Sequence, residues 1–101
     1  MKVYISGKMT GLTDDEIYNT FNAVAKRCEA PGREIINPAH YMKFYRELGY
    51  NYNQIMKHDI EMLMACDVIV MLPNWKESKG AQVEHYVADA CGLQILYINE
   101  M

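Results

Sequence analysis

Two acidic side chains, Asp59 and Glu84, form the most informative pattern in this sequence. Asp59 falls on or beside the apolar stripe of one predicted helix, and Glu84 lies about one turn into a later helix that follows an apolar strand. The positive end of that helix is expected to favour the ionised form of Glu84. Because one strand separates the two acids, they can converge at one mouth of a sheet. Paired carboxylates there fit a retaining glycosidic mechanism, in which one attacks the anomeric carbon and the other protonates the leaving group.

Motifs of other common enzyme classes are absent. The sequence has no glycine-rich dinucleotide fingerprint, no P-loop, no G-x-S-x-G and no H-E-x-x-H. Its three histidines, His40, His58 and His85, are scattered without the spacing of metal ligands. We therefore expect no metal and no cofactor, and we expect His85 to be structural or exposed.

Length and composition predict one folded domain over residues 1–101, since half of the residues are apolar and 23% are charged. The net charge of −3 and the lack of a basic cluster argue against duplex nucleic acid as a partner. No signal peptide or membrane-spanning run is recognisable, so a cytoplasmic location is expected. Cys28, Cys66 and Cys91 lie in apolar segments and are expected to be small buried side chains.

Apolar strands alternate with amphipathic helices along the chain. Strands are expected at 3–5, 34–37, 68–72 and 93–98, and longer helices at 13–28, 53–66 and 80–91. This order predicts an α/β fold, a three-layer doubly wound, flavodoxin-like or Rossmann-like domain with a four-stranded parallel sheet. Ligands of such sheets bind outside the carboxyl ends of the strands. Because four strands leave an open edge and a thin core, we also expect a homo-oligomer, a dimer or larger.

Two helical segments carry more specific expectations. The helix at 80–91 is expected to bury Val83, Val87 and Ala90. The aromatic segment 39–52 suits either a short helix stopped by Gly49 or a partly ordered lid. Its aromatic rings either pack and support an oligomer interface, or form a wall on which a planar ring could stack.

Four segments together resemble a known family. They read VYISGKMTG at 3–11, INPA at 36–39, DI…ACDV within 59–68 and SKGAQVE at 78–84. In order and spacing they are similar to the nucleoside 2-deoxyribosyltransferase superfamily, and within it to small phage and bacterial proteins that begin with a Tyr-Ile-Ser-Gly-x-Met-Thr-Gly pattern. The resemblance covers the chain from end to end.

The resemblance implies roles for individual residues. Glu84 matches the nucleophile that captures C1′ of the sugar, Asp59 the aspartate that handles protonation of the departing base, and Tyr4 the strand-end tyrosine that orients the nucleophile. Residues expected to bind substrate are Gly7, Lys8, Met9, Asn37, Ser78 and Gly80.

The residue at position 78 bears on the substrate. Family members that act on free nucleosides tend to carry an acid there, whereas the branch that hydrolyses deoxynucleoside 5′-monophosphates has a phosphate-binding serine. Ser78, the helix start at Gly80 and the Lys8 ammonium could together bind a phosphate. The resemblance thus implies cleavage of the N-glycosidic bond of a nucleotide or nucleoside, by hydrolysis or base transfer. The alternatives are a nucleotide-sensing module without turnover and a glycohydrolase of NAD-type dinucleotides.

Overall fold

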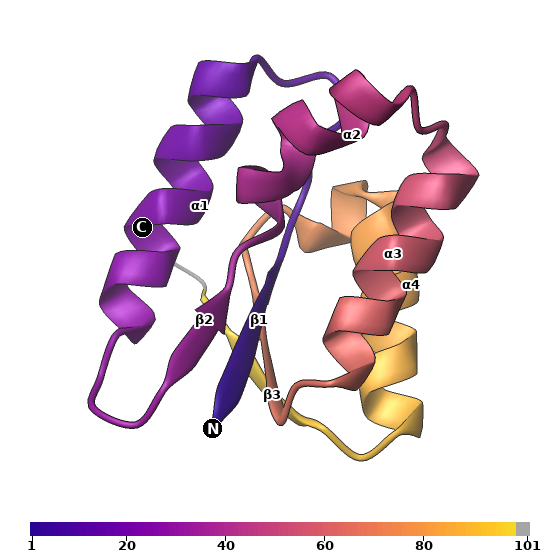
Figure 1. Cartoon of the computed structure of the whole chain (residues 1–101). Helices are drawn as coiled ribbons and strands as arrows, with labels where there is room; N and C mark the ends of the chain where they lie inside the picture. Colours follow the sequence, from indigo (N-terminus) through magenta and orange to yellow (C-terminus); the bar gives the residue numbers. More distant parts are fainter. Residues whose placement is uncertain (99–101) are drawn as a thin grey trace.

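A four-stranded parallel sheet runs through the centre of the computed structural model, which describes residues 1–98 (Figure 1). The strand order is β2-β1-β3-β4, and every neighbouring pair is parallel. The strands are β1 (Lys2–Ser6), β2 (Glu34–Ile36), β3 (Val68–Met71) and β4 (Gln94–Tyr97). The predicted α/β fold with four parallel strands is confirmed.

Helices cover both faces of the sheet. Helix α1 (Asp14–Cys28) lies on one face, and α3 (Tyr52–Met64) and α4 (Lys79–Ala90) lie on the other (Figure 1). Alternate strand residues face opposite layers, since successive side chains of a strand point to opposite sides. Val3 and Ile5 therefore join the core under α1, whereas Tyr4 joins the core under α3 and α4.

The two central strands mark the point where the chain changes direction. Strand β1 leads into α1 on one face, and its neighbour β3 leads into α4 on the opposite face. In open α/β sheets such a divergence leaves a crevice outside the carboxyl ends of the strands. The sheet topology thus places a crevice between the residues that follow β1 and those that follow β3.

The aromatic segment forms ordered helices. It begins with the 3₁₀ helix η1 (Pro38–Tyr41), continues as α2 (Met42–Leu48) and ends at Gly49, whose φ of 68° is readily adopted by glycine. The expected short helix stopped by Gly49 is therefore confirmed. An exposed ion pair between Arg46 and Asp14 joins α2 to the start of α1, with Arg46 Nη1 lying 2.6 Å from Asp14 Oδ2.

Helix α4 buries a face that only partly matches the one that we expected. Val87 is half-buried against the core, but Val83 and Ala90 are exposed. The buried residues that face the sheet are Ala81, Glu84 and Ala88. Small side chains at the contact let the helix approach β1 and β3 closely. Apolar periodicity misassigned this face because one of its three buried positions is an acid.

Two further expectations need correction. Ser6 belongs to β1 and is buried, although the first strand was expected to end at Ile5. Cys66 is buried and Cys28 half-buried, but Cys91 is exposed just beyond α4, so the expected burial is wrong there. In residues 1–98, no helix combines the length and the apolar character needed to cross a membrane.

Gly7 is required by close packing. An added Cβ there would lie 2.8 Å from Leu72 Cβ and 2.9 Å from Leu72 Cδ2, and Leu72 is fully buried. Gly7→Ala is expected to lower the free energy of unfolding by about 1–3 kcal/mol, the usual cost of overpacking. Urea denaturation monitored by circular dichroism measures the change. Thr10→Ala, an exposed position in the same loop, is the matched control, and equal stability of the two variants would contradict this account.

Candidate active site

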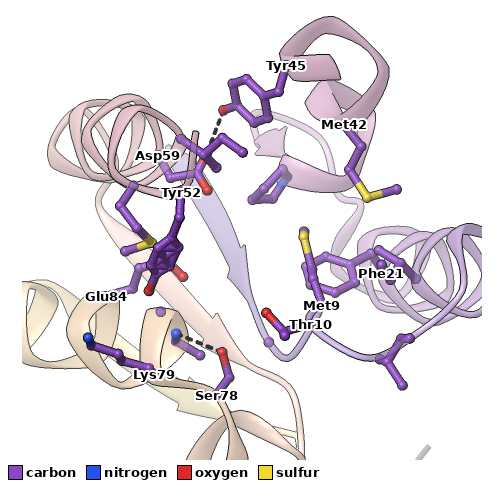
Figure 2. A pocket seen from close by; sticks show the side chains of 18 of the residues that line it. Met9, Thr10, Phe21, Met42, Tyr45, Tyr52, Asp59, Ser78, Lys79 and Glu84 are labelled. Carbon is purple, nitrogen blue, oxygen red and sulfur yellow. Dashed lines mark hydrogen bonds between the residues drawn. The ribbon is translucent and has the colours of Figure 1, made fainter. Parts of the chain in front are cut away.

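A cavity of about 830 Å³ opens at the crevice between β1 and β3, within the size range of small-molecule sites. Figure 2 shows Asp59 and Glu84 on one side of this cavity, with Met9, Phe21 and Met42 across from them. The end of β1, the loop after it, α1, α2, α3 and the first turns of α4 all contribute to the wall. Most of the lining surface is apolar, and its charged side chains include Asp59 and Glu84.

Glu84 is held by two hydroxyl groups of the central strand. Tyr4 Oη donates to Glu84 Oε2 at 2.5 Å, and Ser6 Oγ donates to Glu84 Oε1 at 2.7 Å. All three residues are buried, with exposed fractions of 0%, 1% and 6% for Tyr4, Ser6 and Glu84. Tyr4 and Ser6 share one face of β1 because they are two residues apart. The sheet thus fixes both carboxylate oxygens in one orientation beside the cavity.

Burial decides the protonation of Glu84. Loss of water raises its pKa to about 7, the hydrogen bonds from Tyr4 and Ser6 oppose the rise, and the negative charge of Asp59 adds to it. Burial thus opposes the ionised form that we expected the helix start to favour, and Glu84 is only partly ionised near pH 7. Glu84 lies six residues after the N-cap Ser78, in the second turn, and the helix dipole acts mainly within the first. Burial and the nearby Glu84 charge also raise the pKa of Tyr4 well above its ordinary value, so Tyr4 stays a donor.

Asp59 has a hydroxyl partner of its own. Tyr45 Oη, from α2, donates to Asp59 Oδ1 at 2.5 Å (Figure 2). Burial raises the pKa of Asp59 to about 6, although the Tyr45 hydrogen bond and the nearby His58 charge partly oppose the rise. The two acids that the sequence singled out therefore line one cavity, each fixed by a tyrosine and each with a raised pKa.

Four of the six predicted binding residues line the cavity: Gly7, Met9, Ser78 and Gly80. Ser78 Oγ accepts from the Ala81 amide at 3.1 Å and so caps α4, which leaves its hydroxyl proton able to donate. The start of α4 is closely packed as well, since a Cβ at Gly80 would meet Met56 Sδ at 3.2 Å.

The other two predicted binding residues, Lys8 and Asn37, are not among those that line the cavity. Lys8 Nζ lies 3.8 Å from a carboxylate oxygen of Glu77. The Asn37 side chain accepts from the Ala39 amide and donates to Asn22, which fixes the start of η1. The donors expected around a phosphate thus do not all meet, because Lys8 is paired with an acid beside Ser78.

Sequence reasoning missed Ser6 and Tyr45. The signal for Ser6 was available, because it lies two residues after Tyr4 and so shares the strand face that meets Glu84. Tyr45 gave no local signal, since it meets Asp59 only through the packing of α2 on α3. Within residues 1–98, no three His, Cys, Asp or Glu side chains are grouped to hold a metal ion.

The fold and the site define a doubly wound α/β protein with two buried carboxylates in the crevice at its topological switch point. The chain belongs to the family described as a domain of unknown function (DUF4406), whose sequence profile matches residues 1–97. No curated protein matches the sequence.

A solved structure with a similar fold is that of a 2-desoxiribosyltransferase from Leishmania mexicana, with a TM-score of 0.69 and 22% sequence identity. The match covers 96% of this chain and 63% of the transferase chain. At this identity the likeness establishes the fold. It agrees at that level with the predicted superfamily, whereas the narrower resemblance to proteins with the N-terminal Tyr-Ile-Ser-Gly pattern stays a prediction.

The raised pKa of Glu84 predicts a pH-dependent effect on stability. The native state favours the protonated acid, so the contribution of Glu84 to wild-type stability falls as the pH rises from about 4.5 to about 7. Glu84→Gln carries no charge and should exceed the wild type at pH 8 by on the order of 3 kcal/mol, less the loss of one acceptor. Near pH 4 the two proteins should be equally stable, because Glu84 is then neutral in both states. Urea denaturation at several pH values measures this, and a difference independent of pH would contradict it.

Proposed function

We propose that this protein cleaves the N-glycosidic bond of a nucleoside or nucleoside 5′-monophosphate through a covalent glutamyl-sugar intermediate. The observation that carries the proposal is the placement of Glu84, whose two oxygens accept from Tyr4 and Ser6 at the wall of a cavity that Asp59 also lines. A fixed carboxylate nucleophile and a second carboxyl of raised pKa are the groups that a retaining mechanism needs.

In the first step, an ionised Glu84 oxygen attacks C1′ of the sugar. The C1′–N bond breaks, its electron pair goes to the base, and protonated Asp59 gives its proton to that base. Tyr4 and Ser6 keep their hydrogen bonds to Glu84 and hold the attacking oxygen toward the cavity. The orientation is in place before substrate arrives, which removes the entropy cost of aligning the nucleophile.

In the second step, water or a second base attacks C1′ and breaks the ester bond to Glu84. Asp59, now ionised, takes the proton from the attacking group, so one full turnover returns both acids to their starting states. Hydrolysis and base transfer differ only in the group that attacks. The same pair of side chains serves both outcomes.

The remaining cavity wall supports a nucleoside-sized ligand. Met9, Phe21 and Met42 provide an apolar surface across from the acids, suited to a flat base. For a 5′-phosphate, the Ser78 hydroxyl proton and the start of α4 are the donors at the wall, and Lys79 adds a positive charge there. Lys8 is not counted among these donors, because it is paired with Glu77.

Loss of the nucleophile should abolish activity. A panel of nucleosides, their 5′-monophosphates and NAD is incubated with the protein, and released free base is measured by chromatography. Glu84→Gln is expected to lower the rate by on the order of 10³-fold or more. Rapid acid quenching of the wild type should also yield protein whose mass is increased by one bound sugar.

The matched control is Asp89→Asn, which removes an exposed acid of the same helix and should retain full activity. Full activity in folded Glu84→Gln would exclude Glu84 as the nucleophile. Release of no base from any member of the panel would refute the proposed function.

The pH dependence of kcat/KM follows from the same two acids. Cleavage needs ionised Glu84 and protonated Asp59, whose pKa values are raised to about 7 and about 6. The rate should rise as Glu84 ionises and fall as Asp59 ionises, which gives a bell-shaped pH profile centred between those two pKa values. Because the two acids interact, the apparent pKa of each side of the profile is a property of the pair and not of one residue. Asp59→Asn should remove the fall on the alkaline side. A rate that does not change from about pH 5 to 8 would contradict the assigned roles.

A further inference from the structure

A chain of three side chains runs from the cavity toward the outer surface. Tyr45 Oη lies 2.5 Å from Asp59 Oδ1, and His58 Nδ1 lies 2.8 Å from the same Tyr45 oxygen. No hydrogen bond among residues 1–98 engages Asp59 Oδ2, which is also not closed off from solvent. Since Asp59 lines the cavity, Oδ2 is the oxygen available to a ligand.

The direction of this chain determines where Asp59 carries its acid proton. Tyr45 has one hydroxyl proton and can donate it to only one partner. If His58 Nδ1–H donates to Tyr45, the tyrosine proton must point at Asp59 Oδ1, and the acid proton of Asp59 is then on Oδ2. In the reverse arrangement Tyr45 donates to a bare His58 Nδ1, and Asp59 uses its proton on Oδ1 to bond Tyr45.

We propose that His58 carries a proton on Nδ1, and that Tyr45 and His58 are positioning residues that keep the acid proton of Asp59 on the oxygen facing the substrate. The inference rests on the proposed function, because it assumes that Asp59 protonates a departing base. Both the neutral Nδ1–H tautomer and the imidazolium satisfy it. No proton has to pass along these three side chains during turnover, since Asp59 recovers its proton in the second step.

Packing fixes the two positioning residues. The His58 ring meets Tyr45 edge-on at 5.5 Å between centroids, and it also contacts Tyr41 at 5.9 Å and Phe44 at 6.3 Å. Tyr45 in turn stacks on Tyr50 at 5.6 Å and is only 4% exposed. On its outer side His58 borders a hollow of about 220 Å³ whose other lining residues are Tyr50, Gln54, Lys57 and Glu61. The aromatic segment thus orients the acid as well as covering the cavity.

The kinetic test compares two substrates. One is an ordinary purine nucleoside, whose base needs a proton to leave, and the other is its 7-methylated form, whose cationic base leaves without one. Tyr45→Phe keeps the ring and its stacking but removes the hydroxyl. We expect kcat for the ordinary substrate to fall by about 10-fold or more, while kcat for the 7-methylated substrate changes by less than about 3-fold.

Further variants separate orientation from packing. His58→Leu should show the same selective loss, and His58→Asn should restore part of it, because an amide N–H can take the place of Nδ1–H. Tyr41→Phe removes a hydroxyl from a ring that contacts His58 without joining the chain, and it should leave both rates unchanged. Equal slowing of both substrates by Tyr45→Phe would overturn the inference and leave the proposed function standing.

A measurement on the free protein tests the inference without catalysis. Long-range ¹H–¹⁵N spectra report which ring nitrogen of His58 carries the proton. We expect a protonated Nδ1 in the wild type and loss of that preference in Tyr45→Phe. A bare Nδ1 in the wild type would overturn the inference whatever the activity, whereas a protein with Nδ1–H that cleaves no nucleoside would refute only the proposed function.

Discussion

The burial of the Glu84 carboxylate is the constraint on which the rest of the site depends. A carboxylate removed from water is costly unless hydrogen bonds replace the lost solvent, and here Tyr4 and Ser6 supply them from one face of β1. That arrangement needs β1 in the interior of the sheet, next to β3, and it needs α4 close above both strands. Ala81 and Ala88 make this approach possible because they take little space at the contact.

The two acids differ in their hydrogen-bond partners and in their pKa values, because different elements surround them. Glu84 is held by two hydroxyl groups of the sheet, whereas Asp59 is held by one tyrosine from a short helix above the cavity. The Asp59 charge also contributes to the raised pKa of Glu84. Pairs of acids in unlike environments commonly divide the roles of nucleophile and proton donor. Here the pKa of Glu84 is raised to about 7 and that of Asp59 to about 6, so the proposed roles require the less populated state in which Asp59 holds the proton and Glu84 is ionised.

The sequence was sufficient to predict the sheet, the helices and the convergence of the two acids. These features depend on local periodicity and on the order of elements along the chain. It failed where the outcome depended on contacts between distant segments. The ionisation of Glu84 was misjudged because burial outweighs a helix dipole that is weak by the second turn. Asp59 and Lys8 find their partners, Tyr45 and Glu77, in other elements of the chain. The local sequence around Tyr45 and Glu77 does not predict these contacts.

The bond between Tyr4 and Glu84 joins residues 80 positions apart, which has a consequence for the order of events during synthesis. When the N-terminal half of the chain leaves the ribosome, β1 can pair with β2 on one side only, since β3 and α4 have not yet emerged. Pairings between distant segments form late because loop closure must precede them. Glu84 therefore meets its two hydroxyl donors late in folding, and a partly synthesised chain that lacks α4 carries no assembled site.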